Sequence, residues 1–353
     1  MALSKVDLAN QVENQLPQNL VANNLPFRNI IINGDMSIAQ RATSATGLTG
    51  SGYNTCDRWR SQISSAGTWS QSQSTEVPSG QGFATSYKWD CTTADASLAA
   101  GDSIIFQQRV EAQFLQYLKK GTSNAESLTL SFWVRSNKTG TYIANLYDEN
   151  NRHISKAYTI SSADTWEKKT LTFAGDTTGT LDNDNAQSLQ FNLWLAAGTN
   201  FTSGTLGTSW AANTNADRAV GQVNLADSTS NYILFTGIQL EADTSASDFE
   251  FLPYDVNLQR CQRYFQTYQS GGMICWSGTT ISGANYFQQV RHIVQMRASA
   301  TIGNFTVAGL NGFASGDPSI DYGDPLGFRA TKQSNGNTNE AYFMYKYTAD
   351  AEL

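Results

Sequence analysis

The feature of this chain that most restricts its fold is the alternation of apolar and polar residues in short segments. In the segment 127–135, the side chains of Leu128, Leu130, Phe132 and Val134 would all point to one face of a β-strand. Clusters of Gly, Asn, Asp, Ser and Thr separate this segment from others with the same pattern, at 141–147, 168–173, 189–195 and 232–240. Many short strands with turn residues between them predict an all-β protein, built as a jelly-roll β-sandwich.

Three further segments carry predictions of their own. Residues 29–32 are predicted to form a strand that runs into a tight turn at Gly34. Residues 110–118 place apolar side chains on one side of a helix, which Gly121 would end. A second helix is predicted from 257 to about 268, and we interpret it as a hinge between two domains.

These elements divide the 353 residues into four parts. Residues 1–28 are a short peptide that either trails freely or packs against another chain, as an oligomerisation peptide or as an anchor to the virion. Residues 29–255 form the jelly roll, and 256–270 form a helical connector. Residues 271–353 are predicted to form a smaller C-terminal β-sandwich, with strands at 273–276, 289–294, 301–307 and 341–347.

Composition limits the partners of the chain. The net charge of −7 disfavours nucleic acid, because phosphate binding needs an excess of Lys and Arg. No apolar stretch is long enough to cross a bilayer, so we expect no membrane insertion. The first residues lack the pattern of a secretory signal, which fits a virion part released by lysis and equally a cytoplasmic protein. The four cysteines are widely spread, so we expect free thiols, most of them buried.

Catalytic motifs are missing from the sequence. It contains two histidines, His153 and His292, and neither a GxSxG, a phosphate-binding loop nor an HExxH motif. We therefore expect no enzyme. Paired carboxylates for glycoside hydrolysis stay possible, but nothing in the sequence selects a pair.

Aromatic residues are the best candidates for binding chemistry. The C–H faces of sugar rings stack on aromatic rings, while amide and carboxylate groups address the hydroxyls. Trp59, Trp133 and Trp194 are expected in the core, although Trp133 falls on the opposite face from its apolar neighbours and could line a groove or cover a second layer. Aromatic residues close to Gly, Ser and Asn are the predicted carbohydrate-binding residues: Trp210, Trp276, Tyr286, Trp69 and Tyr53.

Calcium is the one metal that the sequence allows, since it takes oxygen ligands. Asp35 follows the first predicted turn and Glu241 ends the last predicted strand of the jelly roll. The two carboxylates would meet if the first and last strands pair; otherwise both are ordinary surface groups without a metal. No other cofactor is expected.

Several motifs together resemble a module of bacteriophage tail fibres and related virion proteins. They are NIIINGDMSIAQR at 29–41, CDRW at 56–59, SFWVRS at 131–136, GIQLE at 237–241, the segment 254–265, MRA at 296–298 and YTADAEL at 347–353. The resemblance covers nearly the whole chain in order. It implies a jelly roll similar to bacterial carbohydrate-binding modules, assembled as a homotrimer in the virion tail.

The same resemblance implies the partners. Residues 1–28 would attach the chain to other tail proteins, and the C-terminal part would recognise a host surface polysaccharide. The matching motifs mark scaffold: Asp57 and Arg58 are expected to form an internal ion pair, capped by the ring of Trp59. Two alternatives stay open, namely a structural virion protein (a head fibre or tail adaptor) that binds no glycan, and a glycan-degrading enzyme.

Overall fold

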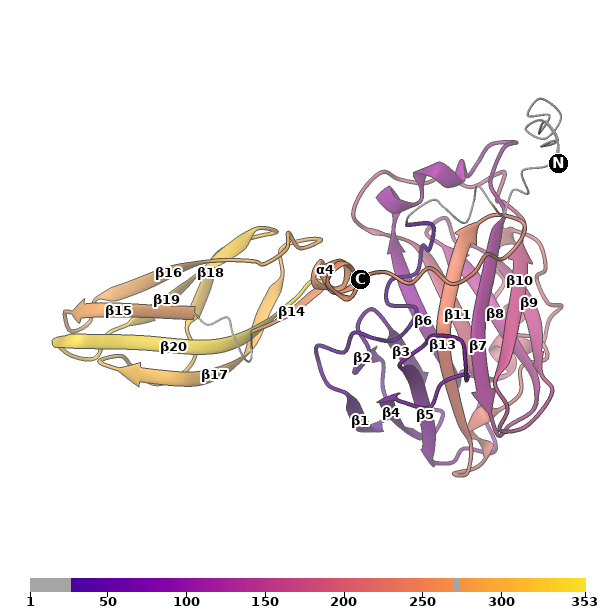
Figure 1. Ribbon diagram of the computed structural model, residues 1–353, viewed down its shortest axis with the longest axis horizontal. Helices are drawn as coiled ribbons and strands as arrows, with labels where there is room; N and C mark the ends of the chain where they lie inside the picture. The colour runs from indigo at the N-terminus through magenta and orange to yellow at the C-terminus, as the bar shows by residue number, and fades with distance from the viewer. Residues whose placement is uncertain (1–26, 269–273) are drawn as a thin grey trace, which may run out of the picture.

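A computed structural model describes residues 27–268 and 274–353 of the chain. It consists of a large β-sandwich and an elongated C-terminal module, with helix α4 (Tyr254–Gln262) between them (Figure 1). Strands dominate the described residues, in which the other α-helix is the single turn α3 (Thr199–Thr202). The all-β prediction is therefore confirmed.

Two antiparallel sheets form the large sandwich. Sheet A has the order β1 (Ser44–Leu48), β4 (Thr68–Ser74), β5 (Ser86–Thr93), β13 (Tyr232–Ala242), β7 (Leu128–Ser136) and β10 (Glu167–Phe173). Sheet B has the order β12 (Ala211–Ala212), β9 (Arg152–Ile160), β8 (Gly140–Asp148), β11 (Gln187–Ala197), β6 (Ser103–Glu111), β3 (Arg60–Ser64) and β2 (Gly52–Tyr53). The chain crosses repeatedly from one sheet to the other, as the connections of a jelly roll require.

The core lies between sheets A and B. Strand β7 contributes the four predicted side chains, Leu128, Leu130, Phe132 and Val134, all of which are buried. The apolar side chains that sheets A and B bury against each other remove a large apolar area from water. This burial is the main stabilising contribution to the sandwich. The alternation of apolar and polar residues therefore predicted the inward face of this strand correctly.

Residues 29–32 do not form a strand, contrary to our prediction. They run beside β13, where the Ile30 N–H donates to the Leu240 carbonyl at 2.9 Å. Side chains replace the remaining ladder bonds: the Asn29 Oδ1 accepts from the backbone N–H groups of Ile31 and Leu240, and the Gln108 Oε1 accepts from Ile32. Local side-chain hydrogen bonds of this kind compete with regular strand pairing.

The predicted helix at 110–118 is also wrong. Val110 continues β6 and pairs with Leu189 of β11, so tertiary strand pairing overrides the helical spacing. Two 3₁₀ turns follow, η1 (Ala112–Phe114) and η2 (Gln116–Leu118). Leu118 is buried as expected, but Phe114 remains 44% exposed.

The second predicted helix is shorter than expected. Helix α4 ends at Gln262, and the following strand β14 (Phe265–Thr267) already belongs to a sheet of the C-terminal module. One sheet of this module contains β14, β20 (Thr338–Asp350), β15 (Ile274–Thr280) and β17 (Thr301–Asn311). The other contains β16 (Asn285–Arg291), β19 (Gly327–Gln333) and β18 (Ser319–Asp324), of which the sequence analysis missed β18 and β19.

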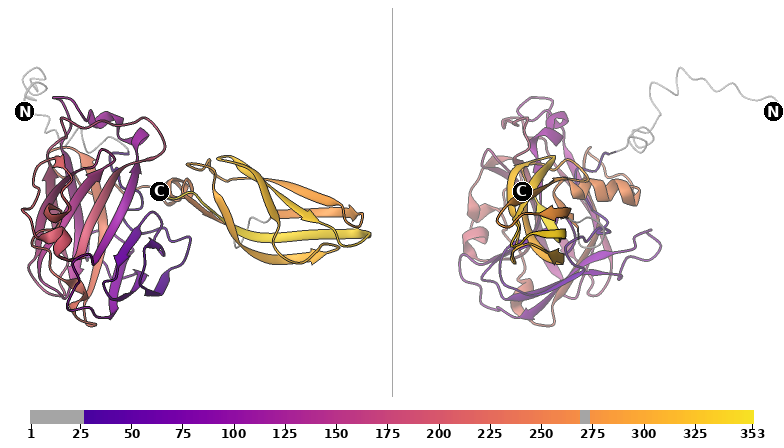
Figure 2. Two further views of the ribbon diagram at one scale, coloured as in Figure 1. Left: turned by 180° about the vertical axis from the view of Figure 1, so that it is seen from behind. Right: turned by 90° about the vertical axis from the view of Figure 1, so that its left-hand side faces the viewer.

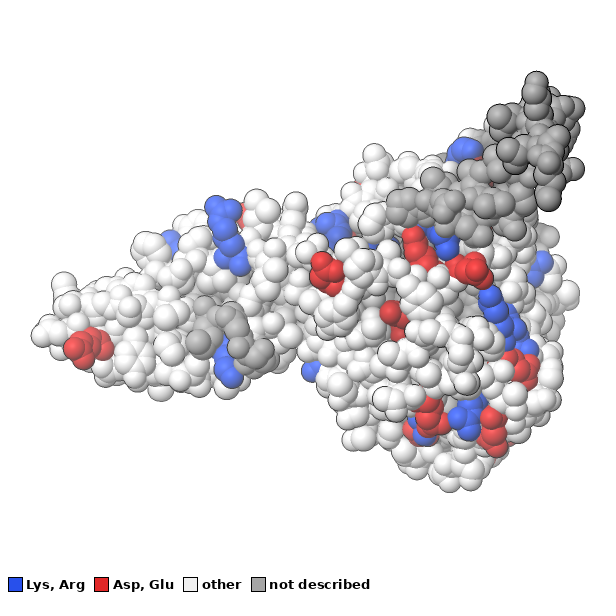
Figure 3. Space-filling model, in the orientation of Figure 1, with Lys and Arg blue, Asp and Glu red and all other residues white. Residues whose placement is uncertain are grey.

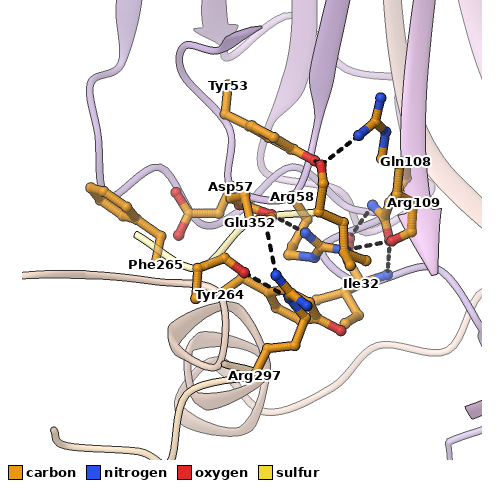
Figure 4. A network of polar contacts seen from close by, with 12 residues as sticks. Ile32, Tyr53, Asp57, Arg58, Gln108, Arg109, Tyr264, Phe265, Arg297 and Glu352 are labelled. Atoms are coloured by element: carbon orange, nitrogen blue, oxygen red, sulfur yellow. Dashed lines mark hydrogen bonds and ion pairs between the residues drawn. The ribbon is translucent and has the colours of Figure 1, made fainter. Parts of the chain in front are cut away.

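The C-terminal module extends away from one side of the jelly roll, and the end of the chain returns to the junction (Figure 2). There, Glu352 forms an ion pair with Arg58, which is 1% exposed and stacks on the ring of Tyr264 at 3.4 Å. Arg109 donates to the Leu353 carbonyl at 2.8 Å. These contacts join strands of the jelly roll to the last residues of the chain (Figure 4).

The expected ion pair between Asp57 and Arg58 is not formed. Asp57 accepts hydrogen bonds from the backbone and side chain of Gln40, and Arg58 turns towards Glu352 instead. The ring of Trp59 does lie in the core, as expected. Residues 57 and 58 lie on an irregular segment, where neighbouring side chains point in different directions. The sequence therefore did not reveal that Glu352 is the partner of Arg58.

The four cysteines are free thiols, as expected, and Cys275 is the exposed one. In the described ranges, neither helix has the length and apolar character needed to cross a membrane.

Candidate carbohydrate-binding groove

A groove of about 330 Å³ lies on the outer face of sheet A, beside the neighbouring strands β10, β7 and β13. Its volume is within the range of small-molecule sites. Four aromatic side chains line it, namely Phe83, Trp133, Phe249 and Phe251. Aromatic rings in a groove on a rigid sheet form the kind of surface on which a sugar ring can stack.

Strand alternation places Trp133 on the groove side of the sheet. Its neighbours Phe132 and Val134 are fully buried in the core, so Trp133 points outward and is only half-buried. The strand register sets Trp133 opposite Lys168 of β10 and Thr236 of β13. The core was our preferred location for this ring, and the groove was the alternative; the structure shows the groove.

A glycine gives the groove its depth. Strand β13 has a bulge between Thr236 and Gln239, and Gly237 within it has φ of +61°. A Cβ at Gly237 would lie 2.4 Å from the ring of Phe83, so only glycine lets this ring settle against the backbone. The bulge therefore turns a flat sheet surface into a recess with an aromatic floor.

The other two rings form a wall beside that floor. The ring centroids of Phe249 and Phe251 each lie 5.1 Å from that of Phe83, and they are 4.9 Å from each other. Phe251 is 51% exposed, which is unusual for a large apolar side chain held in contact with two other rings. An exposed but packed ring offers its face to a ligand without having to move.

Polar groups with unused hydrogen-bonding capacity stand at the edges of the groove. The side chains of Gln81, Lys168 and Asp248 line it and make no hydrogen bond or ion pair with any described residue. The backbone at Asp248 is nevertheless held in place, because its carbonyl accepts from Arg28 at 2.7 Å and from Gln239 at 3.2 Å. An amide, an ammonium and a carboxylate are thus available for the hydroxyls and charges of a ligand.

The groove lacks the carboxylate pair that glycoside hydrolysis needs. Among the described residues that line it, Asp248 is the single carboxylate. Glu250, next to Phe249 and Phe251 in the chain, accepts from the backbone N–H groups of Phe27 and Asn29. The arrangement is suited to binding.

Of the five predicted carbohydrate-binding residues, Trp69 is misassigned. It is 0% exposed, packs against Trp89 with ring centroids 6.1 Å apart, and donates its indole N–H to the Ala66 carbonyl. Position near Ser and Gly residues suggested a loop, but Trp69 belongs to strand β4 and faces the core.

Tyr53 lies in a cleft of about 550 Å³ between the jelly roll and the C-terminal module. Its hydroxyl donates to the Leu353 carbonyl at 2.9 Å, and Arg41 lies over its ring at 5.4 Å. Trp210 donates its indole N–H to the Ala174 carbonyl at 2.7 Å. Both residues therefore use their polar atoms within the protein.

Trp276 and Tyr286, predicted separately, are brought together in the C-terminal module. Their ring centroids are 4.6 Å apart, and both rings contact Phe313. The hydroxyl of Tyr286 accepts from the backbone N–H of Ile281 at 2.7 Å. These two residues form an aromatic cluster between strands β15 and β16.

The two carboxylates of the calcium hypothesis are not neighbours. The segment 30–34 does run beside β13, with one backbone hydrogen bond at each end: Ile30 to Leu240, and Ile238 to Gly34. Asp35 follows the second of these bonds and Glu241 follows the first, so the two carboxylates lie at opposite ends of the paired segment. Asp35 bonds to Ser37 and Asn257, whereas Glu241 bonds to Ser247 and Gln239. No group of three or more potential metal-ligating side chains occurs in the described ranges.

Sequence reasoning missed Phe83, Phe249, Phe251 and Lys168. The signal for Trp133 was present in the alternation of its strand, and the register with β10 would have added Lys168. The phenylalanines lie on irregular segments whose positions depend on the bulge at Gly237, which no pattern in one sequence predicts.

No protein-family model matches the chain, and no curated protein matches it significantly. Among solved structures, the enzymatically active domain of tailspike protein 4 of bacteriophage CBA120 is 14% identical with a TM-score of 0.31; the match covers 62% of this chain and 22% of the tailspike chain. A family 11 carbohydrate-binding module from Clostridium thermocellum, solved with a β-1,3-1,4-mixed-linked tetrasaccharide, is 12% identical with a TM-score of 0.29, covering 57% and 98%. A family 61 module, solved with β-1,4-galactotriose, is 11% identical with a TM-score of 0.31, covering 61% and 99%. These TM-scores are too low to support an argument, so the assignment of the jelly roll rests on the strand order alone.

Proposed function

We propose that this protein is a glycan-binding protein whose jelly roll holds the ligand in the groove on sheet A. One observation carries the proposal: four aromatic rings line a preformed groove at whose edges an amide, an ammonium and a carboxylate have no partner in the described chain. Unpaired polar groups beside exposed aromatic faces match the two needs of a sugar ring, stacking and directed hydrogen bonds. The ligand is bound and not cleaved.

The direct test is a glycan array with the wild-type protein and the variant Phe251→Ala. Phe251 is half exposed, so its truncation removes stacking surface with little loss of core packing. We expect binding to one class of glycan by the wild type and a clear loss in the variant, with unchanged melting temperature. Absence of binding to any glycan would favour the structural virion protein instead.

We further propose that the protein is a homotrimeric tail fibre, located in the phage tail, that attaches the virion to a host surface polysaccharide. The motifs that resemble tail-fibre modules support this role. The peptide 1–28 would join other tail proteins, but residues 1–26 lie outside the described residues. If the role is correct, soluble protein blocks adsorption of the phage to host cells.

The surface of the C-terminal module supports an assembly. It exposes many large apolar side chains for its size: Ile281, Phe287, Ile293, Val307, Tyr322, Leu326 and Tyr342. The face of the module seen in Figure 3 also carries few charged residues. Exposed apolar surface of this kind commonly marks a contact with another protein. Mass photometry should therefore show a trimer, and a clean monomer at micromolar concentration would contradict this part of the proposal.

Binding without cleavage is tested by incubation with the glycan that the array identifies. A reducing-end assay should show no release of sugar. Release that disappears in Asp248→Asn would mean that the groove is catalytic.

A further inference from the structure

Lys168 differs from the other cationic side chains on the outer face of sheet A. Arg135 pairs with Glu76 at 2.7 Å, and Lys88 pairs with Asp90 at 3.2 Å. Lys168 has neither an ion pair nor a hydrogen bond with any described residue, although it lines the groove. A cation that is left unpaired at the edge of a binding groove is available to an anionic ligand.

The strand register fixes where this cation acts. Lys168 of β10 lies directly opposite Trp133 of β7. The Cβ atoms of such cross-strand pairs are about 4.5–5.5 Å apart, so the long Lys168 side chain reaches the ring substituents of any sugar stacked on Trp133. Lys168 is therefore in reach of a group on the sugar ring, not of a distant part of the ligand.

Asp248 gives the groove a direction. It comes from the loop that follows β13, and its backbone carbonyl is held by Arg28 and Gln239. Its carboxylate has no partner among the described residues. This carboxylate repels an anionic substituent and accepts hydrogen bonds from hydroxyls. The anionic group of a ligand is thus favoured at Lys168 and disfavoured at Asp248.

We propose that the groove selects glycans whose sugars carry a carboxylate, with the Lys168 ammonium as the group that recognises it. The inference rests on the proposed glycan-binding function. Because Lys168 is exposed and exposed ion pairs contribute little, we expect the ion pair to raise affinity about threefold over the uncharged sugar. The preference should shrink at high salt, because the Debye length falls from about 10 Å at 0.1 M to about 3 Å at 1 M.

The test uses polysaccharides rich in uronic acids, each beside its carboxyl-reduced form, in which the carboxylate has become a primary alcohol. Calorimetric titration compares the wild type with Lys168→Gln, Lys168→Arg, Trp133→Ala and the control Lys346→Gln. Lys346 of β20 also has no partner among the described residues, so its replacement changes the net charge equally, far from the groove.

We expect the wild type, Lys168→Arg and Lys346→Gln to prefer the acidic form about threefold, and Lys168→Gln to bind both forms alike. Equal binding of both forms by the wild type, or a preference that persists in Lys168→Gln, would overturn the acidic specificity. If the acidic specificity is overturned but Trp133→Ala abolishes binding, the groove remains the proposed glycan site. Binding that does not depend on Trp133, or no binding of any form, would contradict the proposed function itself.

Discussion

The groove on sheet A and the aromatic cluster of the C-terminal module contain similar rings in different surroundings. In the groove, Trp133 is half-buried, and the side chains of Gln81, Lys168 and Asp248 have no hydrogen-bond or ion-pair partner among the described residues. In the C-terminal cluster, Trp276 contacts the rings of Tyr286 and Phe313, and the Tyr286 hydroxyl already accepts a backbone hydrogen bond. Trp133 and Trp276 are both half-buried, but Trp276 packs on three other rings, whereas Trp133 borders an open groove.

This difference is our reason for proposing the groove as the ligand site, because its rings stand beside polar side chains that have no partner among the described residues. A ring that packs on other rings stabilises the protein whether it is near the surface or not. The exposed carboxylate of Asp248 makes no hydrogen bond or ion pair with any described residue, and it lies beside the rings of the groove. We therefore propose that recognition takes place in the jelly roll and not in the C-terminal module, where the family resemblance placed it.

The largest expected effect concerns the core beneath the groove. Phe132→Ala should lower the free energy of unfolding by about 3–5 kcal/mol, because it leaves a cavity among fully buried rings. The ring of Phe132 lies 5.1 Å from that of Tyr158 and is 0% exposed. Urea denaturation measures the change, with exposed Thr170→Ala of β10 as a control expected within about 0.5 kcal/mol. An unchanged melting temperature would show that the inward face of β7 is assigned wrongly.

The next effect concerns the link between the two regions. Arg58→Met should lower the free energy of unfolding by about 3 kcal/mol, since it leaves the buried carboxylate of Glu352 without its main partner. The exposed pair of Arg329 and Asp321 in the C-terminal module serves as the control. Arg329→Met should leave the free energy of unfolding nearly unchanged, because exposed ion pairs contribute little to stability. Equal effects of the two substitutions would mean that the junction is not a buried ion pair in solution.

The two tryptophans should differ in their contribution to stability. Trp276→Ala removes ring contacts to Tyr286, Phe313 and Phe343, so we expect a loss of about 3 kcal/mol in the C-terminal module. Hydrogen exchange followed by mass spectrometry should show faster exchange in β20. Trp133→Ala should cost about 1 kcal/mol or less and leave exchange in sheet A nearly unchanged. The comparison of the two regions fails if Trp133 proves the more important for stability.

A pH effect is expected at Asp57. Burial raises the pKa of this carboxyl to about 6. Because the folded pKa lies above the unfolded value of about 3.9, Asp57 contributes stability that is fully present below about pH 4 and lost as the pH rises through 6. The loss amounts to about 2–3 kcal/mol.

The matched variant is Asp57→Asn, compared with the wild type by urea denaturation between pH 4 and pH 8. The difference in unfolding free energy should move in favour of the variant as the pH rises. A difference that is constant over this range would mean that Asp57 titrates at its ordinary pKa.

The sequence predicted the regular parts of the fold and little of the groove. Alternation placed β7, β8, β10, β11 and β13 because each buries one face against the other sheet. It failed at 29–32 and 110–118, where the Asn29 side chain and the pairing of Val110 with Leu189 determine the structure. Those are tertiary effects, which local patterns do not contain.

For the groove, the sequence could indicate only Trp133. The recess depends on a bulge at Gly237 and on the loop that carries Phe249 and Phe251. Conversely, Trp69 looked like a loop residue because Ser and Gly surround it, yet its strand turns it into the core. Residue type and neighbours alone do not tell which side of a strand faces a ligand.

The central claim is that the groove on the jelly roll, and not the aromatic cluster of the C-terminal module, binds the glycan. The measurement is calorimetric titration of one glycan ligand into Trp133→Ala and Trp276→Ala, beside the wild type. Loss of a stacking ring at the centre of a site costs about 2 kcal/mol or more, so Trp133→Ala should weaken binding at least about 30-fold. Trp276→Ala should bind as the wild type does, within about threefold. The opposite result, with binding lost in Trp276→Ala and kept in Trp133→Ala, would contradict the account and place recognition in the C-terminal module.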